Sequence, residues 1–84
     1  MNQDEFIFDT FDEAMKAHTN VFKLCRVQGY ITYADYLKIK YNKPRKCPSK
    51  YINYGWTHLY GSVLEPYGNE GKWILKMPKI RKIK

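Results

Sequence analysis

Residues 10–29 carry the pattern of one amphipathic helix with both of its ends marked. Thr10 and Glu13 have the spacing of a capping box, in which each side chain accepts a hydrogen bond from the other residue's backbone N–H. Apolar residues then recur at steps of three and four, which predicts one stripe that faces a core. This stripe consists of Phe11, Ala14, Met15, His18, Val21, Phe22 and Cys25. Gly29 is a natural stop, because glycine readily adopts the left-handed conformation found at helix ends.

A second, shorter helix is predicted after a brief extended segment at Tyr30 and Ile31. Thr32 repeats the capping position, with Asp35 as its partner three residues later. The face expected to be buried is formed by Ala34, Leu37 and Tyr41. This helix is expected to end before Pro44, because the residue that precedes a proline resists the α conformation.

The segment 42–50 predicts a loop, since it contains two prolines, four bases and no acid. Ser49 is positioned to cap a third short helix that runs to Tyr54 and is closed by Gly55. Tyrosine and isoleucine, which fill this segment, suit a strand as well. A strand is therefore the alternative for the residues that follow Ser49.

The last third of the chain predicts a β-hairpin. Residues 61–65 are the first expected strand, and Pro66 marks its end because proline cannot donate a ladder hydrogen bond. Residues 68–71 read Gly-Asn-Glu-Gly and form the expected turn. Residues 72–77 are the second expected strand, with alternate side chains on opposite faces.

The 84 residues suffice for one domain with a modest core. We expect an acidic lead-in at residues 1–9, where Phe6 to Phe8 can form a short strand on the core. A globular domain is expected at residues 10–78, and a basic tail that frays at residues 79–84. The predicted fold class is a small single-domain α+β fold, with two to three helices followed by the hairpin.

This order of elements resembles a winged helix-turn-helix domain. In that family a first helix leads through a short strand to the two helices of the motif and then to a two-stranded wing. Here residues 10–27 match the first helix, residues 30–31 the short strand and residues 32–37 the start of the second helix. The resemblance assigns residues 49–54 to the recognition helix and residues 62–77 to the wing. It implies a DNA-binding regulator or accessory factor.

Charge is distributed unevenly along the chain. The net charge is +7 overall, and it divides into −4 over residues 1–20 and +11 over residues 21–84. A field of this sign attracts phosphates, acidic proteins or anionic lipid. Lysine far outnumbers arginine, and lysine neutralises phosphates but reads base edges poorly. We therefore predict a small basic nucleic-acid-binding protein that acts mainly through phosphate contacts, with DNA preferred over RNA.

The predicted binding residues fall in two clusters, and both are expected to face one duplex. They are Lys38, Lys40, Lys43, Arg45, Lys46, Lys50, Asn53, Lys72, Lys76, Lys79, Arg81 and Lys82. Arg45 and Asn53 are the candidates for contact with a base edge. Tyr51, Tyr54 and Trp56 are possible aromatic contacts, since rings stack on bases. For Trp56 the alternative is a place in the core at the turn into the hairpin.

Three other interpretations compete with DNA binding. One is a protein-interaction module, an inhibitor or adaptor that docks on an acidic partner through its basic and aromatic surface. Another is RNA binding, with single strands stacked on the tyrosines. The plainest is a solvated lysine surface above tyrosines that point inward. The size and the lysine and tyrosine content also resemble small proteins of bacteriophages and mobile elements.

No catalytic or metal-binding pattern is visible in the sequence. His18, Cys25, Cys47 and His58 lack the close pairs that zinc sites use, and neither cysteine is marked as an activated nucleophile. We therefore predict no enzymatic activity, no metal and no cofactor. The chain also lacks a membrane-length apolar run and an apolar leader, so a cytoplasmic protein with free thiols and no membrane contact is expected.

Overall fold

The first predicted helix is present as α1 (Phe11–Gln28) in the computed structural model, which describes residues 3–44 and 46–83. The side chain of Thr10 accepts a hydrogen bond at 3.1 Å from the backbone N–H of Glu13, and Gly29 ends the helix in the left-handed conformation at φ 82°. The buried face is narrower than predicted and consists of Ala14, Ala17 and Val21. The larger side chains of the predicted stripe flank this face and stay 40–42% exposed, namely Phe11, Met15 and Phe22.

The second predicted helix is α2 (Tyr33–Tyr41), which follows the short strand β2 (Ile31–Thr32). Thr32 and Asp35 form the complete capping box, with hydrogen bonds of 3.0 and 3.4 Å. The predicted buried face of α2 is confirmed for Leu37 but is otherwise wrong, because Tyr33 and Tyr36 are the other buried residues. Ala34 and Tyr41 are only half-buried. The two tyrosine rings offer far more apolar area than the alanine methyl group, and they take the core positions.

The predicted third helix is replaced by one 3-10 turn and a strand. The turn is η2 (Ser49–Tyr51) and the strand is β3 (Tyr54–Trp56). β3 is the central strand of an antiparallel sheet in the order β2-β3-β6, and β6 (Arg81–Lys82) comes from the basic tail. Strands on both sides of β3 provide hydrogen-bond partners for its backbone N–H and C=O groups. This pairing favours a strand in a segment whose local propensity allows either a helix or a strand. The ordered fold therefore continues past residue 78.

A second antiparallel sheet has the order β1-β5-β4. β4 (Val63–Tyr67) and β5 (Lys72–Lys76) pair in the region predicted for the hairpin. β4 runs through Pro66, which is tolerated because β4 is an edge strand. β5 pairs on its other side with β1 (Ile7–Phe8), which follows the 3-10 turn η1 (Gln3–Phe6). Ile7 and Phe8 of the predicted lead-in therefore belong to the sheet, and the strand pair is not a free wing.

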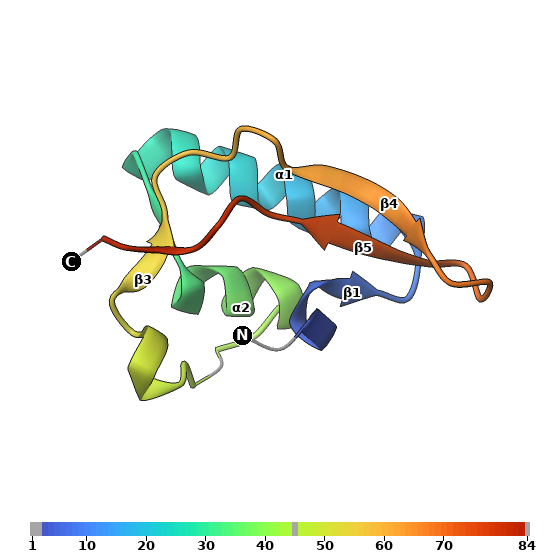
Figure 1. The fold of residues 1–84 in the computed structure, drawn as a ribbon, viewed down its shortest axis with the longest axis horizontal. Coiled ribbons are helices and arrows are strands. Elements are labelled where there is room, and N and C mark those ends of the chain that lie inside the picture. Colours follow the sequence, from blue (N-terminus) through green and yellow to red (C-terminus); the bar gives the residue numbers. More distant parts are fainter. Residues whose placement is uncertain (1–2, 45, 84) are drawn as a thin grey trace.

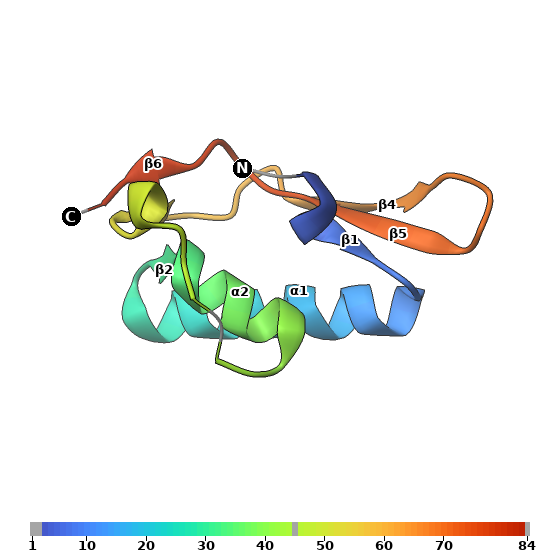
Figure 2. The same cartoon turned by 90° about the horizontal axis from the view of Figure 1, so that it is seen from below.

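Helices α1 and α2 form one layer, and the sheet of β1, β5 and β4 lies across from them (Figure 2). Between the layers Phe6 stacks on Tyr36, with ring centroids 4.7 Å apart, and the edge of Trp56 lies beside both rings. The hydroxyl of Tyr36 donates a hydrogen bond at 2.9 Å to the backbone C=O of Glu5. Nε1 of Trp56 donates one at 2.6 Å to the C=O of Pro78. The aromatic core thus holds the segments near both ends of the chain.

The result is a small α+β fold with two α-helices and two antiparallel three-stranded sheets in the part of the chain that the structure describes. η2 and the C-terminal strand lie at one end of the molecule, and the turn between β4 and β5 lies at the other (Figure 1). Because no third α-helix is present in residues 3–44 and 46–83, the structure does not identify a winged helix-turn-helix domain. Among these residues no helix is long and apolar enough to cross a membrane.

Candidate nucleic-acid interface

The pairing of β3 with β6 brings two basic segments of the sequence together. Tyr54 lies opposite Lys82, Gly55 lies opposite Arg81, and the N–H of Ile83 donates to the C=O of Asn53 at 2.9 Å. This brings the tail against β3, which follows η2 and its basic loop in the chain. The cations gathered there are all exposed, and we refer to them as the basic end: Lys46, Lys50, Lys79, Arg81 and Lys82.

Two of the three predicted aromatic contacts lie at the basic end. Tyr51 and Tyr54 are half-buried, and their rings meet edge to face at 6.1 Å between centroids. Tyr51 also meets Tyr33, at 5.4 Å, and Nζ of Lys50 lies 5.2 Å from the centroid of the Tyr51 ring. Trp56 is 2% exposed and takes its alternative place in the core. The two tyrosines are therefore packed by other rings, and the Lys50 ammonium lies over Tyr51.

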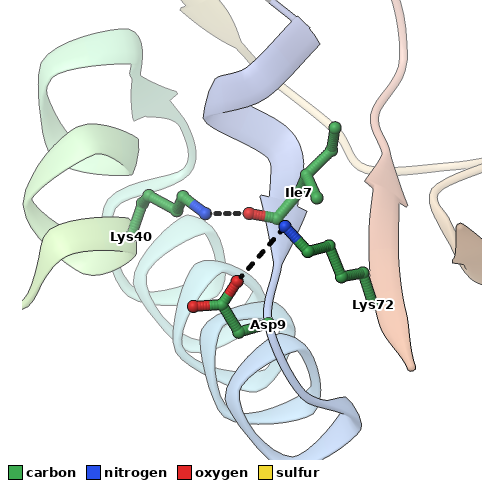
Figure 3. Close-up of polar contacts among 4 residues, drawn as sticks. All are labelled: Ile7, Asp9, Lys40 and Lys72. Atoms are coloured by element: carbon green, nitrogen blue, oxygen red, sulfur yellow. Dashed lines mark hydrogen bonds and ion pairs between the residues drawn. The ribbon is translucent and has the colours of Figure 1, made fainter. Parts of the chain in front are cut away.

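Lys40 is directed inward and not toward solvent. Its ammonium donates a hydrogen bond to the backbone C=O of Ile7 (Figure 3). It also lies 4.0 Å from the centroid of the Phe8 ring. Burial lowers the pKa of Lys40, although nearby carboxylates partly oppose this shift. The predicted phosphate contact is replaced by a contact that joins α2 to β1.

The two predicted cations of the hairpin are paired with carboxylates. Nζ of Lys72 lies 3.8 Å from Asp9, on the other side of β1 from Lys40 (Figure 3). Nζ of Lys76 lies 2.9 Å from Glu65 on the neighbouring strand. Lys72 stands beside the turn between β4 and β5, at the opposite end of the molecule from β6 (Figure 1). The second predicted cluster, which combined the hairpin with the tail, is therefore divided: its hairpin cations Lys72 and Lys76 lie apart from the tail cations that pair with β3.

The other predicted binding residues are scattered or lie outside the described structure. Lys38 lines a hollow between α1 and α2. Lys43 is exposed just after the end of α2, and Asn53 is exposed just before β3. Arg45 lies outside the described residues. Sequence reasoning missed that β3 pairs with the tail, because a two-residue strand leaves almost no periodic signal.

The histidines and cysteines of the chain do not form a metal-binding cluster in the described structure. In residues 3–44 and 46–83 no three His, Cys, Asp or Glu side chains gather to hold a metal ion. Nε2 of His18 lies 3.3 Å from the hydroxyl of Ser62, and burial lowers the pKa of this imidazole. Burial also raises the pKa of the Cys25 and Cys47 thiols, which lowers the fraction of reactive thiolate.

Comparison with known proteins adds no further constraint. No protein-family model matches the chain, and no curated protein and no solved structure matches it at a significant level.

Proposed function

We propose that this chain binds nucleic acid, and duplex DNA in particular, through phosphate contacts at its basic end. The observation that carries the proposal is the antiparallel pairing of β3 with β6. It gathers lysines and an arginine from two distant segments onto one end of the protein. In the part of the chain that the structure describes, neither ion pair involves a cation of the basic end. Cations without a carboxylate partner are available to replace the counterions of a phosphate backbone.

Duplex DNA is favoured over single strands because the tyrosine rings at the basic end are half-buried and packed against other rings. Single-strand binding depends on exposed ring faces on which unstacked bases lie. Tyr51 and Tyr54 are half-buried and already pack against each other, and Tyr51 also packs against Tyr33. The cations then supply most of the binding, and phosphates are their natural ligand.

Little base readout is expected from this surface. η2 is a single 3-10 turn, which is too short to lie along a major groove as a recognition helix does. Phosphate contacts fix position on a duplex but carry no direct sequence information. The proposed role is that of a DNA-binding regulator or accessory factor with limited sequence preference.

A titration at several salt concentrations tests the proposal. Labelled duplexes of two unrelated sequences, a single strand and an RNA of equal length are compared by fluorescence anisotropy. Both duplexes are expected to bind with similar affinity, in the micromolar range or tighter at low salt. The logarithm of the association constant should fall with the logarithm of the salt concentration with a slope of about −4.5, if about five phosphates are neutralised. Failure of all four ligands to bind at low salt would refute the proposal.

A further inference from the structure

A shallow groove between the two helices combines an apolar floor with a basic rim. It is a hollow of about 450 Å³ lined by Asn20, Lys23, Leu24 and Val27 of α1 and by Lys38, Ile39 and Asn42 of α2. The four α1 residues are spaced i, i+3, i+4 and i+7, and so they form one continuous face of the helix. This face is separate from the line of Ala14, Ala17 and Val21 that packs into the core.

The floor of the groove consists of apolar side chains that are only partly covered by the rest of the protein. Val27 is 82% exposed, and Leu24 and Ile39 are half-buried. Exposed apolar side chains that are contiguous and rimmed by polar groups are typical of interaction sites. The groove is thus better suited to an apolar ligand surface than to a phosphate backbone, which gains nothing from Leu24 or Ile39.

The charge of the rim defines the kind of partner. Lys23 and Lys38 stand on opposite helices, and no carboxylate is among the lining residues. An adjoining hollow shares Asn20, Ile39 and Asn42 with the groove and includes Asp9 and Glu13, so the acids begin only at its far end. A partner with apolar side chains on one face and carboxylates beside them matches both the apolar floor of the groove near Val27 and its basic rim. A second copy of this chain is a poorer match, because each copy carries a net charge of +7.

We infer that this groove docks an acidic amphipathic helix of a partner protein. A groove between two helices is a common seat for such a helix, which inserts side chains spaced i, i+3, i+4 and i+7. Its leucines or isoleucines contact Leu24, Val27 and Ile39, and its glutamates or aspartates pair with Lys23 and Lys38. This inference is independent of the proposed DNA binding, which uses the basic end and not the groove.

A synthetic peptide tests the inference on the full chain. The probe is a labelled peptide of about 14 residues, long enough to form a helix, with leucines at i, i+3, i+4 and i+7 and glutamates beside them. A second peptide carries lysine in place of each glutamate. The acidic peptide is expected to bind and to shift the amide resonances of Leu24, Val27 and Ile39, whereas the lysine peptide is expected not to bind. The resonance shifts require no substitution, so they remain informative if a variant fails to fold.

Matched variants separate the groove from net charge. Lys23→Glu with Lys38→Glu is expected to weaken peptide binding at least about tenfold, and Val27→Asp is expected to weaken it similarly. Lys46→Glu with Lys50→Glu makes the same change in net charge at the basic end and is expected to retain binding within about twofold. Equal loss in the two double variants would overturn the inference. So would equal binding of both peptides, no binding at all, or a dimer of the free chain that Val27→Asp dissociates.

Discussion

The substitution Gly55→Ala is expected to destabilise the protein by about 3 kcal/mol, because β2 and β3 approach closely at this residue. A Cβ atom at position 55 would lie 2.1 Å from the carbonyl oxygen of Ile31 and 2.8 Å from Cα of Thr32. Both are backbone atoms, so no side-chain rotation relieves the overlap. β2 would have to retreat by roughly 1.3 Å or more to reach ordinary contact.

The magnitude follows from the cost of overpacking, which is typically about 1–3 kcal/mol. The upper end applies here because the displaced backbone is paired with the central strand of the sheet, next to the buried Trp56. The total stability of a chain of this length is roughly 4–12 kcal/mol. A loss of about 3 kcal/mol lowers the Tm by roughly 12–24 °C.

Urea and thermal unfolding followed by circular dichroism measure this effect. Gly29→Ala is the matched control, since it adds the same methyl group at a residue with φ 82° and no neighbouring atom within 4 Å. Its expected cost is about 1 kcal/mol, from the left-handed backbone alone. If Gly55→Ala costs no more than Gly29→Ala, the close approach of β2 and β3 is not as described.

Two further predictions concern groups that the fold buries. Lys40→Met is expected to lower the free energy of unfolding in urea by about 1–2 kcal/mol, because it removes the ammonium from the Ile7 carbonyl. The control Lys38→Met, on the exposed side of the same helix, is expected to change it by less than about 0.5 kcal/mol. Equal effects of the two substitutions would contradict the inward role of Lys40. Burial raises the pKa of Tyr33 to about 12 and also raises the pKa of Tyr36. The folded state therefore holds these two protons more tightly than the unfolded state does. The free energy of unfolding should fall as the pH rises above 10 toward 12. Tyrosinate absorbance recorded with unfolding across this range checks the prediction, Tyr36→Phe should flatten the dependence, and a stability that rises over the same range would refute it.

The sequence predicted the elements whose signals are local. The side chains of Thr10 and Thr32 cap their helices by accepting hydrogen bonds from backbone N–H groups three residues later. Gly29 ends α1, and all of these contacts involve only neighbouring residues. The strands on either side of the Gly-Asn-Glu-Gly turn were located for the same reason. Caps and tight turns are written into a few adjacent residues, so no knowledge of the remaining fold is required.

The rest depends on partners far away in the chain. Residues 54–56 become a strand because β2 and β6 pair with them on both edges, and a short tyrosine-rich segment does not encode that choice. Pro66 lies inside β4 and not at its end, because the outer edge of β4 pairs with no other strand and therefore needs no backbone N–H donor. Which face of α2 is buried was likewise decided by the aromatic core and not by helical spacing alone.

The candidate site was predictable in composition but not in geometry. Lysine-rich segments indicated phosphate binding, yet a lysine at residue 40 looks no different in the sequence from one at residue 50. Only the fold sends Lys40 to the Ile7 carbonyl and leaves Lys50 exposed over the Tyr51 ring. The basic end exists because β6 pairs with β3, a contact between segments more than twenty residues apart.

Charge removal at matched pairs of lysines tests the central claim most directly. Two double variants lose the same charge at different places. One combines Lys50→Gln with Lys82→Gln at the basic end, and the other combines Lys72→Gln with Lys76→Gln at the hairpin. Both should keep the circular dichroism spectrum of the parent chain. The salt dependence of duplex binding is then measured for each. The basic-end variant is expected to lose about 2 from the slope of the logarithmic salt plot and at least about tenfold in low-salt affinity, whereas the hairpin variant should change by less than half as much. Equal losses in the two variants would contradict a binding site at the basic end.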